Sequence, residues 1–146
     1  MTRRRASANE GQPRLATIQP SRDWAEEIAN SVTHGVGLAL SMAALIALVL
    51  LAAYRETPWH VAGVAIYGAS LVGLYGVSTL YHAVGESRWK HSLRVADHAF
   101  IYVLIAGTYT PFTLTVLRGP WGWTLFSLAW AAAVLGVVFK VISSNR

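Results

Sequence analysis

The chain has 146 residues, of which 54% are hydrophobic and 13% are charged, and its formal net charge at pH 7 is +5. Soluble domains carry about 25% charged residues, whereas here twelve basic and seven acidic residues leave long uncharged runs between them. These properties exclude a soluble globular domain, and the absence of cysteine excludes disulfides and thiolate metal sites.

The first segment of the chain, residues 1–22, is polar and contains five arginines. It cannot bury a hydrophobic core, so we expect a disordered basic tail on the cytoplasmic side of a membrane. We expect no signal peptide, because no apolar stretch begins before residue 28. The membrane domain is predicted to cover residues 23–142.

Four uncharged runs follow the tail, at 28–54, 57–85, 98–117 and 119–139. Each has at least 20 residues, which is about the length needed to cross the hydrocarbon core of a bilayer. The predicted fold class is therefore all-α, a polytopic helical membrane protein with four transmembrane helices. Proline, glycine, charged residues and tryptophan mark the turns and predict spans at roughly 33–53, 60–82, 97–117 and 121–141.

The basic residues predict how these spans are oriented. Ten of the twelve lie in the tail, in the loop between the second and third spans, or after the fourth span. Only Arg55 and Arg118 lie on the other side. Since short loops rich in Lys and Arg remain cytoplasmic, we expect both termini to be cytoplasmic in a multi-pass protein of the cell membrane. The same distribution favours the lipid bilayer as partner and excludes nucleic acid.

The second span is rich in small residues. Such residues allow helices to approach closely in a membrane, so we interpret them as packing positions in preference to ligand contacts. They are Gly63, Gly68, Ala69, Gly73, Gly76 and Ser78.

Five polar side chains lie at the predicted cytoplasmic ends of the spans, where each needs a partner or a function. Ser78 and His82 are one helical turn apart on one face, Asp97 opens the third span, and His34 lies at the start of the first. His98 follows Asp97 and points about 100° away from it on a helix. The group is compatible with one corner of a metal site. The alternative is that these side chains cap helix ends and extend to the interface.

Three motifs in this chain resemble the bacterial hemolysin III family. They are residues 27–37 (EIANSVTHGVG), 78–82 (STLYH) and 97–112 (DHAFIYVLIAGTYTPF). That family is related to the progestin and adipoQ receptors, so the resemblance implies that the chain forms the N-terminal part of a seven-helix fold with an intramembrane zinc. It implies further that His82 binds the metal, that Asp97 acts through a metal-bound water, and that Ser78 lies beside the site. Ser78 and Asp97 are thus the candidate catalytic residues.

The chain departs from the family pattern in its last spans, which are absent together with their His-x-x-x-His pair. Two of three histidine ligands are then missing, so we expect zinc to be bound weakly or not at all. We also expect His82→Ala to change the melting temperature little. We interpret the chain either as a product truncated after the fourth span or as a complete protein. Its expected protein partner is a second copy of itself or the missing C-terminal part.

The resemblance implies a cytolytic, pore-forming activity as the function. Two alternatives remain open: a zinc-dependent membrane lipid hydrolase, and a receptor-like protein of membrane homeostasis. We assign no enzymatic activity to the 146-residue chain, since a metal-dependent hydrolysis would need the full family fold.

Overall fold

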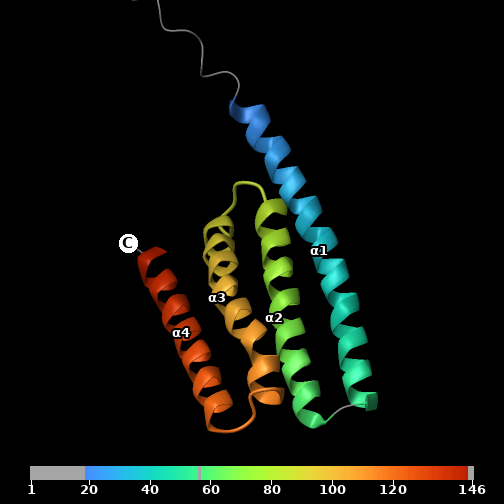
Figure 1. The fold of residues 1–146 in the computed structure, drawn as a ribbon. Coiled ribbons are helices and arrows are strands. Elements are labelled where there is room, and N and C mark those ends of the chain that lie inside the picture. Colours follow the sequence, from blue (N-terminus) through green and yellow to red (C-terminus); the bar gives the residue numbers. More distant parts are fainter. Residues whose placement is uncertain (1–18, 56, 145–146) are drawn as a thin grey trace, which may run out of the picture.

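The computed structural model describes residues 19–55 and 57–144, and within these ranges the chain is helical and contains no strand. Four α-helices follow one another along the chain (Figure 1). This confirms the predicted all-α fold class. The helices are α1 (Gln19–Arg55), α2 (Pro58–Ala83), α3 (Lys90–Thr115) and α4 (Pro120–Ser144).

The four helices form a single layer. Within the described chain the backbones of α1 and α2, of α2 and α3, and of α3 and α4 pack against each other, and no other pair of helices packs in this way. Figure 1 shows them side by side, with the start of α1, the α2–α3 loop and the end of α4 at one end of the layer. Both broad faces of the layer are therefore uncovered. The first turns of α1 extend beyond the other helices at this end (Figure 1).

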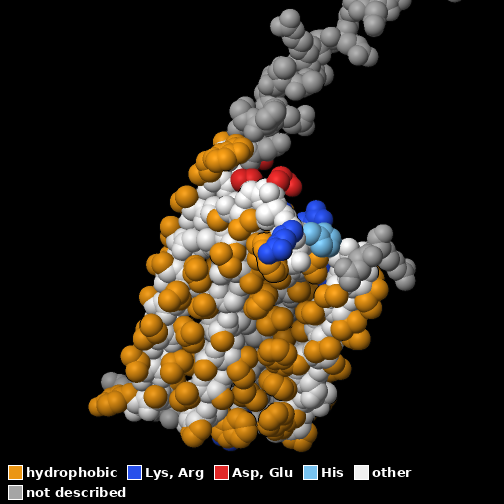
Figure 2. Space-filling view, turned by 180° about the vertical axis from the view of Figure 1, so that it is seen from behind, with side chains coloured by type: hydrophobic (Ala, Val, Ile, Leu, Met, Phe, Trp, Pro, Cys, Tyr) orange, Lys and Arg blue, Asp and Glu red, His pale blue; other side chains and the backbone are white. Residues whose placement is uncertain are grey.

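The composition of the helices identifies a helical membrane protein. Stretches long and apolar enough to cross a bilayer occur in α1, α2 and α4, over Trp24–Tyr54, Pro58–Ala83 and Pro120–Ser144. Helix α3 has the same length as α2 but begins with several charged and histidine side chains, and it lies between α2 and α4. Figure 2 shows hydrophobic side chains over most of the face in view and a group of charged side chains near one end of it.

Every helix is longer than its predicted span. Helix α1 begins at Gln19 and not near residue 33, so the helix includes the last residues assigned to the tail 1–22; the remainder of that tail lies outside the described residues. Helix α3 begins at Lys90 and not at residue 97. The spans were predicted from apolarity, whereas a helix continues through polar residues wherever its backbone hydrogen bonds can form.

Small residues bring the helices together, as predicted for the second span. Among them Gly63, Gly68 and Ser78 are buried, although Ala69 is exposed. A methyl group on Gly68 would overlap Leu45 of α1, and one on Gly73 would overlap Phe100 of α3. Backbones that approach this closely gain dispersion contacts that larger residues would prevent.

Candidate functional site at the polar end of the layer

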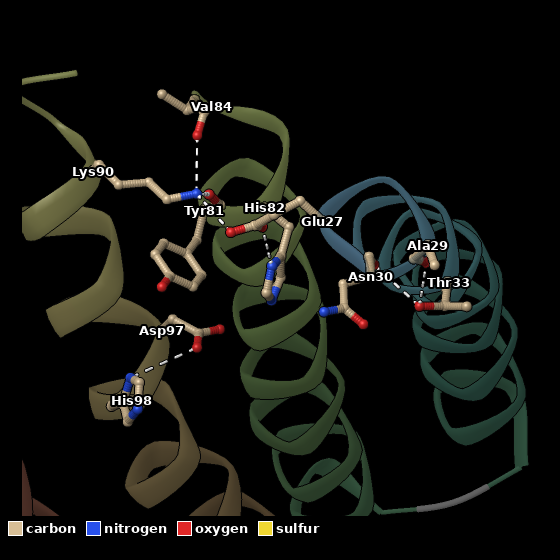
Figure 3. A network of polar contacts seen from close by, with 10 residues as sticks. All are labelled: Glu27, Ala29, Asn30, Thr33, Tyr81, His82, Val84, Lys90, Asp97 and His98. Atoms are coloured by element: carbon tan, nitrogen blue, oxygen red, sulfur yellow. Dashed lines mark hydrogen bonds and ion pairs between the residues drawn. The ribbon is translucent and has the colours of Figure 1, made fainter. Parts of the chain in front are cut away.

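Glu27 joins three segments of the chain at one point. Its Oε2 lies 2.7 Å from Nδ1 of His82 on α2, and its Oε1 accepts a hydrogen bond of 3.3 Å from Nζ of Lys90 at the start of α3 (Figure 3). The side chains of His82 and Lys90 are 17% and 18% exposed, whereas that of Glu27 is 40% exposed. These contacts connect α1 directly to the end of α2 and the start of α3.

Lys90 is held in place by several acceptors besides Glu27. Its Nζ donates to the carbonyl oxygens of Tyr81 at 2.8 Å and Val84 at 3.0 Å. The ammonium also lies 4.5 Å from the centre of the Tyr81 ring, in a cation–π contact. An ammonium group has three N–H donors, and here all three have acceptors. Lys90 thus provides a donor for two carbonyl oxygens at the end of α2 and neutralises the charge of Glu27.

The short α2–α3 loop positions Lys90 for these contacts. The amide of Val84 donates to Leu80 O at the end of α2, and the amide of Lys90 donates to Ser87 O at the start of α3. The Ser87 hydroxyl accepts from the amide of Trp89 at 3.3 Å. These bonds reverse the chain within a few residues, so Lys90 returns toward the helix end from which the chain has come.

His34 lies next to His82 across the α1–α2 contact. The two imidazole rings stack with centroids 5.5 Å apart and planes inclined by 26°. The ring of Tyr75 flanks His34 at 5.8 Å. Nδ1 of His34 is buried and has no hydrogen-bond partner in the described chain. The sequence placed His34 at the same membrane depth as His82, and the structure places the two rings in contact.

Ser78 and Asp97 occupy the same region from α2 and α3. Ser78 is 3% exposed and lies one turn before His82. The Asp97 side chain is 16% exposed, and in Figure 3 it extends from α3 toward α2. This orientation agrees with Phe100, which is one turn further along α3 and packs against Gly73 of α2.

His98 lies on the exposed side of α3, where its ring remains near the Asp97 carboxylate. It is exposed, its Nδ1 donates to Arg94 O at 2.8 Å, and its distance to Asp97 Oδ2 is 3.7 Å.

The donors present here do not fit a zinc site. Zinc in proteins takes three or four protein ligands in tetrahedral geometry, and the described residues contain no group of three or more His, Cys, Asp or Glu side chains placed to hold a metal ion. His82 uses Nδ1 to contact Glu27, and its ring is stacked on that of His34, so the two imidazoles do not converge on one point. The arrangement supports a network of hydrogen bonds.

Comparison with known proteins gives the family. A family model described as "Haemolysin-III related" matches residues 22–146. The chain belongs to this haemolysin-III related family. It is 46% identical over 121 residues to the "Hemolysin-3 homolog" of Bacillus subtilis (strain 168), a match that covers 83% of this chain and 57% of the relative.

Two further relatives extend the comparison. "Hemolysin-3" of Bacillus cereus is also 46% identical over 121 residues, covering 83% of this chain and 55% of the relative. The "Monocyte to macrophage differentiation factor" of Homo sapiens is 31% identical over 129 residues, covering 83% and 52% respectively. The chain thus spans about half the length of the curated relatives that it matches. No solved structure matches it.

In this haemolysin-III related chain, the sequence motifs contained Glu27 but gave it no role, and Lys90 was counted only as a topological charge. The sequence gives one signal for Glu27: an uncompensated carboxylate near the start of an apolar helix requires a partner. That partner could not be identified from spacing, because His82 and Lys90 are 55 and 63 residues away.

Proposed function

We propose that this chain acts in the bacterial cell membrane as a cytolytic, pore-forming protein of the haemolysin-III type, with both termini in the cytoplasm. The names of the two Bacillus relatives, Hemolysin-3 and its homolog, support a role in lysis. Since the chain spans about half their length, the activity of the whole relatives is carried over as part of this proposal.

The proposal rests on the arrangement of the helices in a single layer whose two broad faces are uncovered. Within the described chain each helix packs only on its neighbours in sequence, apart from the side-chain contact of Glu27 with Lys90, so a single copy encloses no channel. Large apolar side chains are exposed along all four helices. In a membrane, association of such layers through small residues and close packing is favourable. A water-filled path would therefore form between several associated copies, and this implies self-association as a step in permeabilisation.

Liposomes reconstituted with increasing amounts of the chain test this function. Release of a small trapped dye should rise more steeply than in proportion to the protein-to-lipid ratio, since several copies build one pore. A co-trapped large dextran should remain inside. Absence of dye release at every ratio, or equal release of dye and dextran, would contradict a pore of defined size.

A second candidate function is a zinc-dependent membrane lipid hydrolase. It is favoured by Asp97, which extends from α3 toward α2, the helix that carries His82 and, one turn earlier, Ser78. The metal would need ligands from outside the described residues, because these contain no suitable group of three. The pore-forming proposal needs no such addition and is therefore preferred.

A further inference from the structure

A groove of about 470 Å³ lies beside the Glu27 network, between the projecting start of α1 and the end of α2 with the loop that follows. Trp24, Ile28 and Val32 line it from α1, and Glu86 and Lys90 line it from the opposite side. Its size is that of a site for a small molecule. Figure 2 shows hydrophobic, acidic and basic side chains close together at this end of the molecule.

The α1 side of the groove is apolar and lies at the level expected for a membrane interface. Trp24 is 72% exposed and Ile28 is 50% exposed, although both line the groove. Tryptophan is enriched at the headgroup level of bilayers. A stripe at helical spacing continues from groove residue Ser31 toward the middle of α1. It consists of Gly35, Ala39, Met42 and Ile46, of which the last three are exposed.

The charges in the groove favour a cation. Lys90 is paired with Glu27, and all three of its N–H donors have acceptors, so it has no free donor for a phosphate. Glu86 lines the groove, is exposed, and forms no ion pair within the described chain. Among these three charged side chains one negative charge therefore remains without a partner. On the other side of the groove lies Trp24, whose aromatic ring can attract a cation.

We propose that this groove binds the ammonium headgroup of phosphatidylethanolamine, with an acyl chain along the stripe on α1. The primary ammonium donates hydrogen bonds to the Glu86 carboxylate and lies against the indole of Trp24. A quaternary choline headgroup has no N–H to donate to the carboxylate, and phosphatidylglycerol has no cation. The groove thus discriminates between headgroups by hydrogen bonding and charge. This inference is independent of pore formation.

Native mass spectrometry of the full chain, given equimolar phosphatidylethanolamine, phosphatidylcholine and phosphatidylglycerol in detergent, tests the proposal. We expect retention of phosphatidylethanolamine about fivefold above the other two lipids, which corresponds to about 1 kcal/mol, the net contribution of one hydrogen bond to the Glu86 carboxylate. Glu86→Gln should reduce the preference over phosphatidylcholine to near equality. Trp24→Ala should weaken retention of both ammonium lipids relative to phosphatidylglycerol, because a primary and a quaternary ammonium both make the cation–π contact. Both side chains are exposed, so neither substitution removes a core contact.

Matched controls separate the groove from the rest of this membrane end. Trp89→Ala removes an exposed tryptophan outside the groove, and Glu26→Gln removes an exposed carboxylate outside it. Both variants should keep the preference of the unmodified chain. Equal retention of all three lipids, preferential retention of phosphatidylglycerol, or an unchanged preference in Glu86→Gln would overturn the proposal. Loss of the preference in either control would overturn it as well, since the site would then not be this groove.

Discussion

Glu27 shows how one side chain can join segments that are distant in sequence. The carboxylate contacts an imidazole through one oxygen and an ammonium through the other, so His82 and Lys90 share one partner. Neither contact is deeply buried, and hydrogen bonds between membrane helices contribute on average less than about 1 kcal/mol. The effect of the network is therefore mainly on geometry: it fixes the start of α1 against the α2–α3 loop.

Substitution of His82 tests this account at the residue scale. His82→Ala removes the contact with Glu27 and the stack on His34. We expect a loss of about 1 kcal/mol and a fall in melting temperature of roughly 2–8 °C in detergent. The sequence alone predicts little change in melting temperature, because there His82 is considered only as a metal ligand. The contacts with Glu27 and His34 raise the expected change. The fall should be the same with and without a zinc chelator.

His98→Ala is the matched control, because His98 is exposed and both partners of its Nδ1, Arg94 O and the Asp97 carboxylate, belong to its own helix. Its melting temperature should remain close to that of the unmodified chain. Elemental analysis should find well under one equivalent of zinc after dialysis. A melting temperature that falls in His82→Ala only when zinc is present would show that a metal, and not Glu27, holds this histidine.

At the scale of the helices, small residues determine how closely the layer packs. Gly107 is buried in α3, and a methyl group there would overlap the Ser70 side chain of α2. One turn further, Thr110 is completely buried, and its hydroxyl accepts a hydrogen bond of 3.1 Å from the indole N–H of Trp130 on α4. Helix α3 is therefore fixed on both sides within a single turn.

Enlarging Gly107 should separate α2 from α3. We expect Gly107→Leu to destabilise the chain by about 1–3 kcal/mol, since overpacking forces backbone shifts. Ala131→Leu, at an exposed position of α4, makes a comparable addition where nothing is displaced and should be nearly neutral. Thermal unfolding in the same detergent measures both variants. Equal melting temperatures for the two would mean that the α2–α3 contact is looser than the structure indicates.

The elements were more predictable from sequence than their contacts. Four uncharged runs gave four helices, because the length of an apolar run determines whether it can span a bilayer. The small residues of the second span correctly predicted that neighbouring helices pack closely against it. The pairing of Glu27 with His82 and Lys90 was not predictable, since it depends on how α1 lies against a loop more than 50 residues away. The stack of His34 on His82 was likewise not predictable. The sequence indicates how deep each histidine lies in the membrane, but not the direction in which each helix turns its side chains.

For the whole molecule, the layer imposes a consistent topology. Four antiparallel helices bring the start of α1 and the end of α4 to the same end, where the α2–α3 loop also lies (Figure 1). Arg88, Lys90 and Arg94 lie at this end, whereas Arg118 lies in the opposite turn. This separation of charge supports the proposed cytoplasmic location of the end that carries the start of α1 and the end of α4.

Helix α3 decides whether the chain crosses the membrane three or four times. By composition α1, α2 and α4 are long and apolar enough to span, whereas α3 carries charges over its first turns. From His98 to Leu117, however, the chain is uncharged for 20 residues, and α3 is covered on two sides by α2 and α4. A polar start at the interface with an apolar remainder is compatible with spanning.

Reporter fusions in the turns test the four-span topology. Alkaline phosphatase, which is active only outside the cytoplasm, should be active after Thr57 and after Gly119. Green fluorescent protein, which fluoresces when it folds in the cytoplasm, should be bright after Ser87 and after Ser144. The decisive pair is Ser87 and Gly119, which flank α3. If these two positions report the same side while Thr57 reports the opposite one, α3 does not cross the membrane and the C-terminal end of α4 lies outside. If Thr57 and Ser87 report the same side, α2 does not span and the layer is not oriented by its basic residues.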